Sequence, residues 1–251
     1  MVSRTSDRRA KIEAAATTTG RGGANRVVVA TVVAVLAIAA VVAGVVIADQ
    51  NKKSDLSKGG SSLPQGASAM GVGLVANPAA PANVPTLDIW ADLQCPACKQ
   101  FEDTFGGQVD DMAKSNQVRL VVHVLSFLDQ NLGNDSSNRA ANAAFCAADQ
   151  DAFLPYFRGT YAIQPAQEGT GYTDAQLRQV AEASGITGSD LDTWQKCYDA
   201  RDHNQYVESV QMQSAKDGVN STPTIKINGK QVQLQGLTPQ SFADQVKAAT
   251  R

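Results

Sequence analysis

The sequence predicts an α/β domain that is interrupted by a long helical segment and preceded by a single membrane-spanning helix. Three observations lead to this prediction. Residues 27–48 form an unbroken apolar run without any charge. Strand-like apolar runs at residues 86–91 and 118–125 flank a helical pattern, which indicates a parallel pair of strands joined by a crossover helix. Residues 133–217 then carry only helical patterns before strand patterns return.

Length and composition limit the possible function classes. The chain has 251 residues, of which 43% are hydrophobic and 18% charged, and its net charge is -2. This length accommodates one domain of ordinary size together with appendages. The nearly neutral charge argues against nucleic acid as a partner, because binding to phosphate backbones needs a strongly basic surface.

The N-terminal part of the chain divides into three segments. Residues 1–26 are basic and polar without apolar periodicity, as is typical of a disordered tail. At about 1.5 Å per residue, the apolar run of residues 27–48 is long enough to cross a bilayer as a helix. Basic residues before it predict a cytoplasmic tail, with everything after residue 48 outside the cytoplasm. Residues 49–69 are rich in Ser, Gly, Lys and Gln, which indicates a flexible linker.

A cleaved secretory signal is the alternative interpretation of the apolar run. Val46, Ile47 and Ala48 offer a site that a signal peptidase could cut, but the run is longer than the roughly 7 to 15 apolar residues of a signal peptide. We therefore favour an uncleaved anchor in the cell membrane. With either interpretation the cysteines lie outside the cytoplasm, where disulfides form and persist.

The folded domain is expected to extend over residues 70–251. Residues 70–75 are predicted to form a short first strand, and the proline-rich residues 77–85 a loop. Residues 86–91 form the second strand. Residues 118–125 are apolar and β-branched almost throughout, as in a central strand that is buried on both faces.

The helix between these two strands starts at Pro96. Its pattern pauses at Gly106 and Gly107 and then resumes to Lys114. Because glycine weakens a helix interior, we expect the glycine pair to kink or break this helix.

The helical block contains four predicted stretches. Thr173 and Gln176 form a capping-box pattern at the start of the third stretch, and Gly185 fits its C-terminal cap. Asp135 or Ser136 is the expected N-cap of the first stretch. The four stretches cover residues 136–149, 151–161, 173–185 and 189–216.

Strands and a final helix close the domain. Residues 224–227 and 230–234 are predicted to form a hairpin around Asn228-Gly229, a pair that suits a type I′ turn. Thr238 as N-cap and Pro239 as first helical residue begin a last helix, which ends near residue 249.

The candidate functional site is the sequence Cys95-Pro96-Ala97-Cys98 at the end of the second strand. Two intervening residues keep both sulfur atoms within one helical turn, and the free N–H groups at the start of a helix favour a thiolate there. Cys95 is therefore predicted to have a lowered pKa and to act as nucleophile. Pro96 suits the first helical turn because it needs no N–H partner. This is a thioredoxin-type redox arrangement.

Metal binding and an inert disulfide are the alternatives for this motif. A single C-x-x-C also occurs in half of a zinc ribbon and in copper carriers, but a zinc site would need two more ligands at short spacing. Cys146 and Cys197 stand singly and far apart, and the only histidines are His123 and His203. The spacing favours redox chemistry, and no metal site or cofactor is predicted.

Three motifs together resemble the DsbA-like thiol:disulfide oxidoreductases, and most closely their membrane-anchored actinobacterial members. The resemblance covers residues 70–251 and implies a thioredoxin fold with an inserted all-helical subdomain. The motifs are Cys95-Pro96-Ala97-Cys98-Lys99, Ala140-Ala141-Asn142-Ala143-Ala144, and Ser221-Thr222-Pro223-Thr224 followed by Asn228-Gly229-Lys230.

The resemblance also implies a supporting loop beside the cysteines. Thr222-Pro223 matches the cis-proline loop of the family, which lies against the two cysteines and offers backbone groups to a bound peptide. A cis bond is compatible with this position because it occurs essentially only before proline, although the cis assignment itself comes from the family.

Two departures from the family concern proton transfer and thiolate stabilisation. Many thioredoxin-fold proteins carry a buried acid six residues before the first cysteine, where this chain has Ile89, so another group or water must serve the resolving cysteine, Cys98. Asp92 is a candidate, but it also fits an ordinary carboxylate at a strand end. Pro96-Ala97 lacks the histidine of the strongest oxidants in the family, so Cys95 is expected to be less strongly activated.

The two remaining cysteines are predicted to form a structural disulfide. Four cysteines allow three connectivities, and once the C-x-x-C pair is assigned, Cys146 is left with Cys197. In the chain-entropy model, closing a loop of this length contributes roughly 4 kcal/mol, less any strain. Two free buried thiols are the alternative.

The histidines are given structural interpretations. His123 lies in the buried strand and is expected to be a hydrogen-bonded core residue. His203 lies in polar helical surroundings and is expected at the surface.

The sequence thus predicts a membrane-anchored, extracytoplasmic protein-disulfide oxidoreductase that introduces disulfides into reduced exported polypeptides through Cys95 and Cys98. The resemblance implies reoxidation by a quinone-coupled membrane oxidase that is similar to DsbB or to vitamin K epoxide reductase. One alternative is a reductase or isomerase that a membrane electron donor keeps reduced. The other is a non-catalytic metal carrier or binding module with the two thiols as ligands.

Overall fold

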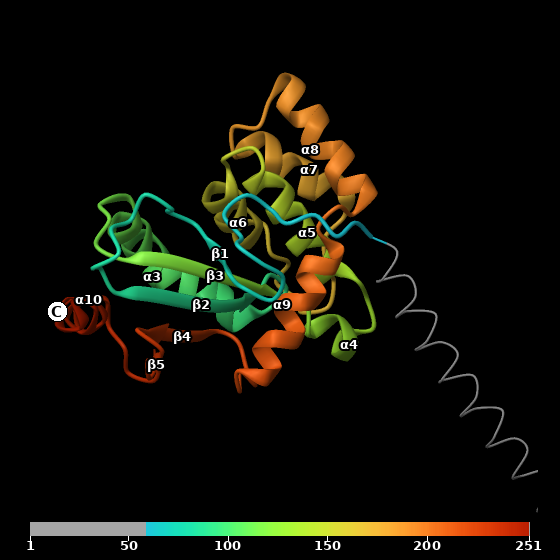
Figure 1. Ribbon diagram of the computed structural model, residues 1–251. Coiled ribbons are helices and arrows are strands. Elements are labelled where there is room, and N and C mark those ends of the chain that lie inside the picture. The colour runs from blue at the N-terminus through green and yellow to red at the C-terminus, as the bar shows by residue number, and fades with distance from the viewer. Residues whose placement is uncertain (1–58, 251) are drawn as a thin grey trace, which may run out of the picture. The chain divides into compact units, whose positions relative to one another are not determined.

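A computed structural model describes residues 59–250 (Figure 1). The predicted tail, the predicted transmembrane segment of residues 27–48 and the first part of the linker lie outside the described residues. Among the residues that are described, no helix has both the length and the apolar character needed to cross a bilayer.

The domain is built on a mixed five-stranded sheet with the strand order β1-β3-β2-β4-β5. The parallel pair is β2 and β3, and the other neighbouring strands are antiparallel. The strands are β1 (Leu74–Val75), β2 (Thr86–Asp92), β3 (Arg119–Leu125), β4 (Thr224–Ile227) and β5 (Lys230–Gln231).

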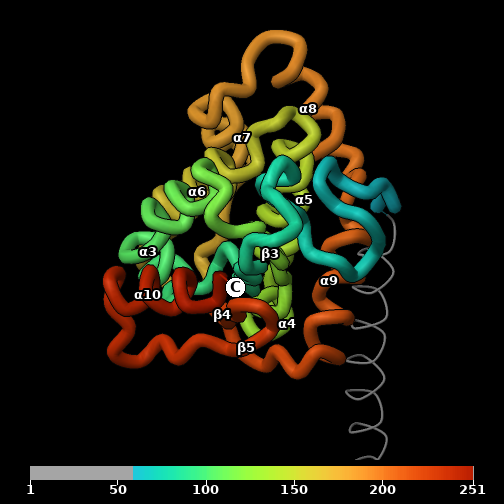
Figure 2. Tube along the Cα trace, turned by 60° about the vertical axis from the view of Figure 1, so that its left-hand side comes forward, coloured from blue at the N-terminus to red at the C-terminus, as the bar shows by residue number. Residues whose placement is uncertain are grey.

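Two helices belong to the sheet, and six form the insert between β3 and β4. In Figures 1 and 2, α3 and α10 lie side by side, and α7 and α8 lie farthest from the sheet, beyond α5 and α6. Phe101 and Phe105 of α3 pack against Phe242 of α10, with ring centroids 6.4 and 5.6 Å from that of Phe242. The helices are α3 (Pro96–Lys114), α4 (Leu128–Leu132), α5 (Ser136–Ala148), α6 (Phe153–Ala162), α7 (Asp174–Ala183), α8 (Gly188–Ala200), α9 (Asn204–Lys216) and α10 (Pro239–Ala249).

β2 is the central strand, and its position brings the C-x-x-C sequence to the edge of the sheet where α3 begins. Leu87 and Ile89 are buried opposite Leu120 and Val122 of β3, so the position of the family's acid is filled by a core residue. The predicted apolar runs therefore form the core, and an α/β domain with a helical insert is confirmed.

Of the kink or break expected at Gly106 and Gly107, the break is wrong, because α3 is one continuous helix. A Cβ atom on Gly106 would overlap the Arg158 guanidinium and lie 2.8 Å from Glu102 Oε2. Arg158 of α6 reaches across Gly106 to form ion pairs with Glu102 and Asp110. Gly106 thus makes room for a link between α3 and α6.

The predicted helical stretch of residues 189–216 is also wrong as one helix, since it forms α8 and α9. Arg201 ends α8 in the left-handed conformation, with a φ angle of 52°. Its N–H donates to Tyr198 O, and the N–H of Asp202 donates to Cys197 O, each at 3.1 Å. These are the two bonds of a Schellman motif, formed here with arginine instead of glycine.

Local capping and turn predictions agree with the structure. Thr173 and Gln176 form a reciprocal capping box at the start of α7. Asn228 and Gly229 have φ angles of 48° and 76°, as a type I′ turn requires. The strand that follows is shorter than expected, because β5 ends at Gln231.

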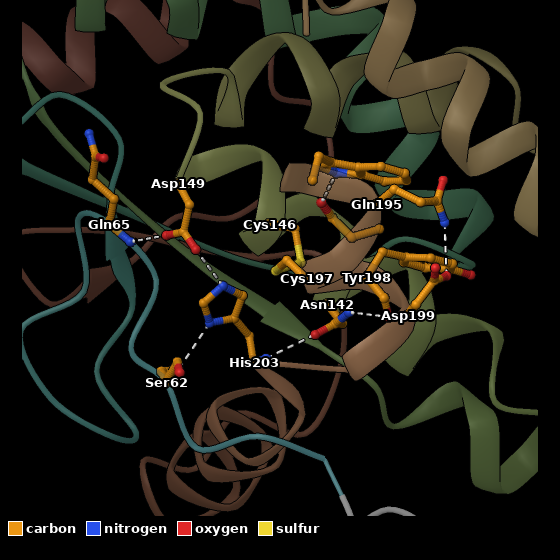
Figure 3. The surroundings of a disulfide bond; sticks show 12 residues. Ser62, Gln65, Asn142, Cys146, Asp149, Gln195, Cys197, Tyr198, Asp199 and His203 are labelled. Atoms are coloured by element: carbon orange, nitrogen blue, oxygen red, sulfur yellow. Dashed lines mark hydrogen bonds and ion pairs between the residues drawn. A yellow bond between two sulfur atoms is a disulfide. The ribbon is translucent and has the colours of Figure 1, made fainter. Parts of the chain in front are cut away.

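Cys146 of α5 and Cys197 of α8 form a disulfide with a Cα–Cα distance of 5.9 Å (Figure 3). The predicted disulfide is therefore confirmed, and the alternative of two free thiols is wrong. The bond links two helices of the insert whose cysteines are 51 residues apart in sequence.

His203 is buried beside this disulfide, so its expected surface position is wrong. Its side chain is 1% exposed. Nδ1 lies 2.9 Å from Ser62 O, and Nε2 lies 2.8 Å from Asp149 Oδ2. Asp149 Oδ1 in turn accepts the Gln65 N–H at 2.8 Å (Figure 3). The hydrogen bonds that join Ser62 and Gln65 to this His203–Asp149 pair hold residues 62–65 against the insert.

His123 is a core residue, as expected. Its ring stacks on Trp90 with centroids 4.1 Å apart, and Nε2 lies 3.1 Å from Asp88 Oδ1.

Candidate functional site

Cys95 and Cys98 lie at the start of α3, and both thiols are free. Cys95 is the N-cap residue, with an extended backbone (φ -76°, ψ 119°), and Pro96 is the first helical residue. Cys95 is 7% exposed and Cys98 only 1% exposed. Cys95 is therefore the more accessible of the two thiols, and Cys98 is enclosed by the protein.

The surroundings shift the pKa values of the two thiols in opposite directions. The hydrogen bond from the Cys98 thiol is the largest cause that lowers the pKa of Cys95, and with the N–H groups of Cys98 and Ala97 it outweighs burial, to give about 6. Burial raises the pKa of Cys98 well above its ordinary value, and the nearby Cys95 raises it further. At neutral pH, Cys95 is a thiolate and Cys98 keeps its proton.

The Thr222-Pro223 loop lies against Cys95. The peptide bond between these two residues is cis, and Cys95 Sγ lies 3.6 Å from Thr222 O. β4 begins at Thr224, which is paired with Trp90 of β2, so the sheet register brings the loop to the cysteines. The buried Thr222 hydroxyl has no hydrogen-bond partner within the described residues, and its position beside the two thiols lowers the pKa of both.

A groove of about 390 Å³ opens beside this pair. Ala97 and Pro223 form its end next to the cysteines, and none of its lining residues is charged. The remaining lining residues are Gln100, Phe101, Thr104, Phe105, Leu234, Gln235 and Leu237.

Asp92 is fully buried, and its carboxylate accepts hydrogen bonds from backbone N–H groups next to the site. Oδ1 accepts the Gln94 N–H at 2.9 Å and the Ser137 hydroxyl at 2.6 Å, and Oδ2 accepts the Leu128 N–H at 3.1 Å. Burial raises its pKa to about 7 against the effect of these bonds. No hydrogen bond of this carboxylate within the described residues reaches either sulfur. Its contacts tie the end of β2 to the start of the insert.

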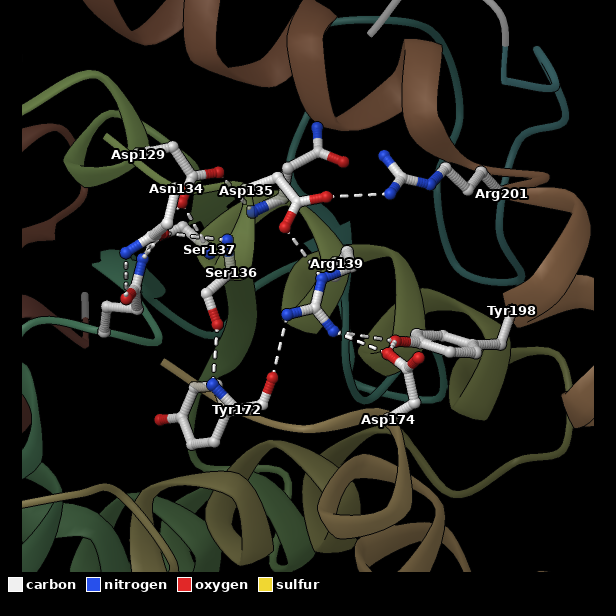
Figure 4. A network of polar contacts seen from close by, with 12 residues as sticks. Asp129, Asn134, Asp135, Ser136, Ser137, Arg139, Tyr172, Asp174, Tyr198 and Arg201 are labelled. Carbon is white, nitrogen blue, oxygen red and sulfur yellow. Dashed lines mark hydrogen bonds and ion pairs between the residues drawn. The ribbon is translucent and has the colours of Figure 1, made fainter. Parts of the chain in front are cut away.

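Polar side chains continue this junction into α5. Asp129 accepts the N–H groups of Ser137 and Asn138 at 2.8 Å each, which satisfies the N-terminus of α5. The Gln94 amide donates to Asp129 and Asn134 at 2.9 Å each (Figure 4 shows the Asp129 side of this network). The junction between sheet and insert is thus held together by hydrogen bonds between polar side chains and the backbone.

Glu102 is a buried acid that the sequence interpretation missed. It lies one turn after Cys98 in α3, and burial raises its pKa to about 7 although Arg158 opposes this shift. Its spacing of four residues from Cys98 places it on the same helix face, together with Phe101 and Phe105. That spacing is the signal by which it could have been found.

Three insert residues that bond the backbone before Cys95 were also missed. They are Tyr161, Gln164 and Tyr172, for which no functional role is predicted from the sequence. Nothing in the sequence indicates that these side chains bond the backbone of a segment about 70 residues earlier.

One model of a known family matches most of the domain. The family is described as thioredoxin, and the match covers residues 74–248.

Solved structures of disulfide oxidoreductases are similar to this chain. The reduced disulfide bond oxidoreductase DsbG of Mycobacterium tuberculosis has 29% identity and a TM-score of 0.55, over 66% of this chain and 77% of that one. Reduced DsbA of the same organism has 28% identity and a TM-score of 0.55, over 66% and 82%. MdbA, a thiol-disulfide oxidoreductase of Corynebacterium diphtheriae, shares the fold at 21% identity with a TM-score of 0.59, over 78% and 99%.

A curated relative has a different overall organisation. The serine/threonine-protein kinase PknE of Mycobacterium tuberculosis is 28% identical over 126 residues, which are 44% of this chain. The chain spans 22% of the length of that relative. The family match and the solved structures agree, however, on the described domain. The chain therefore belongs to the thioredoxin family, and its resemblance to the DsbA-like thiol:disulfide oxidoreductases is confirmed.

Proposed function

We propose that the chain is an enzyme of thiol–disulfide exchange, in which Cys95 is the reactive thiol and Cys98 the resolving thiol. The opposite pKa shifts of these two free thiols support the proposal most directly. A low thiolate pKa makes Cys95 a good leaving group, and a protonated Cys98 does not compete as nucleophile.

In the proposed reaction the oxidised enzyme takes two electrons from a dithiol substrate. A substrate thiolate attacks Cys95 Sγ, the Cys95–Cys98 bond breaks, and Cys98 leaves and takes up a proton. The second substrate thiolate then attacks the substrate sulfur of the mixed disulfide. A substrate disulfide forms, and Cys95 leaves as a thiolate.

The substrates are proposed to be reduced, exported polypeptides. An extended peptide suits the uncharged groove, because Phe101, Phe105 and Leu237 offer apolar contact next to the reactive sulfur. Cis-Pro223 and Thr222 then lie beside the mixed disulfide, where backbone groups can pair with the peptide.

Oxidation is the proposed direction in the cell. A stabilised Cys95 thiolate favours the dithiol form of the enzyme and thus the transfer of the disulfide to a substrate. A quinone-coupled membrane oxidase similar to DsbB or vitamin K epoxide reductase is the proposed reoxidant. A reductase or isomerase would use the same two thiols. It would differ from an oxidase because a membrane electron donor would keep both thiols reduced.

The location is proposed to be the cell membrane, with residues 1–26 in the cytoplasm, residues 27–48 as anchor and the catalytic domain outside. The apolar run and the basic residues before it support this topology. The Cys146–Cys197 disulfide also suits an oxidising compartment.

The redox state of Cys95 and Cys98 in intact cells tests the direction. After rapid acid quenching and thiol alkylation, an oxidase is expected to carry the pair mainly as a disulfide. A pair found mainly as dithiol would instead indicate the reductase or isomerase. A purified full-length chain that carries stoichiometric zinc or copper and does not exchange with glutathione would contradict both and favour the metal carrier.

A further inference from the structure

Backbone carbonyls on both sides of Gln94 are bound by side chains of the insert. The Tyr172 hydroxyl donates to Leu93 O at 2.6 Å. The Gln164 amide donates to the same oxygen at 2.8 Å and to Cys95 O at 3.2 Å.

A third donor acts one residue earlier. The Tyr161 hydroxyl donates to Asp92 O at 3.1 Å, and the same oxygen accepts the Cys95 N–H at 3.0 Å. We call Tyr161, Gln164 and Tyr172 the carbonyl clamp. Tyr161 lies in α6, and Gln164 and Tyr172 lie in the loop between α6 and α7, so the clamp comes entirely from the insert.

The clamp is itself held rigidly. The Tyr172 N–H donates to Ser136 Oγ at 2.7 Å, and Tyr172 O accepts from Arg139 Nη2 at 2.8 Å (Figure 4). Tyr161 and Tyr172 are 1% and 3% exposed, and burial raises the pKa of each phenol, so both hydroxyls stay protonated donors.

The conformation that the clamp fixes is the one that stabilises the thiolate. An N-cap side chain accepts hydrogen bonds from the second and third helical residues only while its own backbone is extended. Cys95 is the N-cap of α3 and has this extended backbone, although its thiol makes no capping hydrogen bond in the structure. Ala97 is the second helical residue and Cys98 the third. Their N–H groups are among those that favour the Cys95 thiolate.

We infer that Tyr161, Gln164 and Tyr172 are positioning residues for thiol–disulfide exchange, because they hold Cys95 in the capping conformation that presents its sulfur to the N–H groups of Ala97 and Cys98. The helical insert thereby tunes the reactivity of a thiol that belongs to the sheet domain. This inference deepens the proposed function and rests on it.

The test compares three clamp variants of the full-length chain with two matched variants elsewhere in the insert. Tyr161→Phe and Tyr172→Phe remove one hydroxyl each, and Gln164→Met removes the amide at a partly exposed position. The matched variants are Tyr156→Phe and Gln195→Met, whose side chains bond Leu177 O, Arg178 and Asp199 and not the backbone before Cys95.

The readouts are the pKa of Cys95, from its alkylation rate against pH, and the equilibrium constant with glutathione. Each clamp variant is expected to raise the pKa by on the order of half a unit, since one net hydrogen bond is worth about that much. The equilibrium should shift toward the oxidised enzyme by roughly threefold. The matched variants should change neither value.

Thermal unfolding separates positioning from plain support of the fold. Clamp variants that lower the melting temperature as much as the matched variants, while the pKa of Cys95 stays at the wild-type value, would overturn the inference. The pKa does not depend on any substrate, so this result differs from a failure of the proposed function, in which the wild-type chain itself does not exchange with glutathione.

Discussion

Arg158 of α6 lies in the space that a side chain at position 106 of α3 would need. Gly106→Ala is therefore expected to destabilise the domain. Overpacking costs about 1–3 kcal/mol and the displaced Arg158 leaves Glu102 without its partner, which outweighs the roughly 1 kcal/mol that alanine gains over glycine inside a helix. Chemical denaturation measures the change.

The neighbouring glycine supplies the control for this prediction. A Cβ atom on Gly107 would meet nothing within 4 Å, so Gly107→Ala should stabilise the domain by about 1 kcal/mol. Equal effects of the two substitutions would contradict the assigned role of Gly106.

The ion pair of His203 and Asp149 predicts a pH-dependent stability. Burial alone would lower the pKa of His203, but the hydrogen bonds to Asp149 and Ser62 outweigh it and raise the pKa. The protonated form is thus favoured in the folded state. The stabilisation by protonated His203 is complete below the pKa of about 6.5 that a histidine has in the unfolded chain. It is lost as the pH rises through the higher pKa of His203 in the folded state.

Urea unfolding of the wild type and of His203→Gln, from about pH 5.5 to 8.5, isolates this contribution. The raised pKa values of Asp92 and Glu102 also lower the stability as the pH rises, but they do so equally in both proteins. The difference in unfolding free energy between the two proteins therefore reports on His203. Stability curves that stay parallel over the whole range would refute the prediction.

The disulfide of the insert is expected to stabilise without taking part in exchange. Replacing Cys146 and Cys197 together by Ala should lower the free energy of unfolding by up to about 4 kcal/mol. The alkylation rate of Cys95, measured well below the melting temperature, should stay unchanged. A variant that is equally stable, or one with a slower Cys95, would argue against a purely structural bond.

Covalent trapping tests the assignment of the two thiols. Cys98→Ala removes the group that releases bound substrate from the enzyme side, and cells that carry it should accumulate reducible adducts with exported proteins. Pro223→Thr should also prolong adducts, because it disturbs the loop beside the sulfurs. Cys95→Ser should form none. Adducts that persist with Cys95→Ser and vanish with Cys98→Ala would reverse the assignment.

The groove predicts a selective effect on peptide substrates. Leu237→Glu places a charge in the uncharged lining and should slow exchange with a reduced dithiol peptide several-fold, while exchange with glutathione stays as it was. Met212→Glu is the matched control, since Met212 is 59% exposed on α9 and outside the groove. Equal slowing of the peptide and of glutathione would show that the groove does not select.

Local patterns predicted most of the fold. The apolar runs of β2 and β3, the capping box of Thr173 and the Asn228-Gly229 turn each depend on residues close in sequence, so one sequence is enough to find them. The cysteine pair and the proline loop were located in the same way, because their spacing and family motif are also local.

Most of the errors concern contacts between distant segments. Gly106 looked like a helix breaker because Arg158, its reason for being glycine, lies 52 positions later. Arg201 ends α8 without the glycine or proline that marks most helix ends. His203 looked polar and exposed because its partners Asp149 and Ser62 come from two other segments, and the hydroxyls of Tyr161 and Tyr172 gave no sign of the backbone that they bond.

The attachment of the N-terminal segment to the α8–α9 corner has a mechanical consequence. Gly60 and Ser62 donate their N–H groups to Arg201 O and Asp202 O at 2.9 and 3.1 Å. A pull on the chain before Gly59 therefore loads this corner first, and the Cys146–Cys197 bond passes the load on to α5. A force applied to that end of the described chain thus enters the domain through the helical insert and not through β2 or the start of α3.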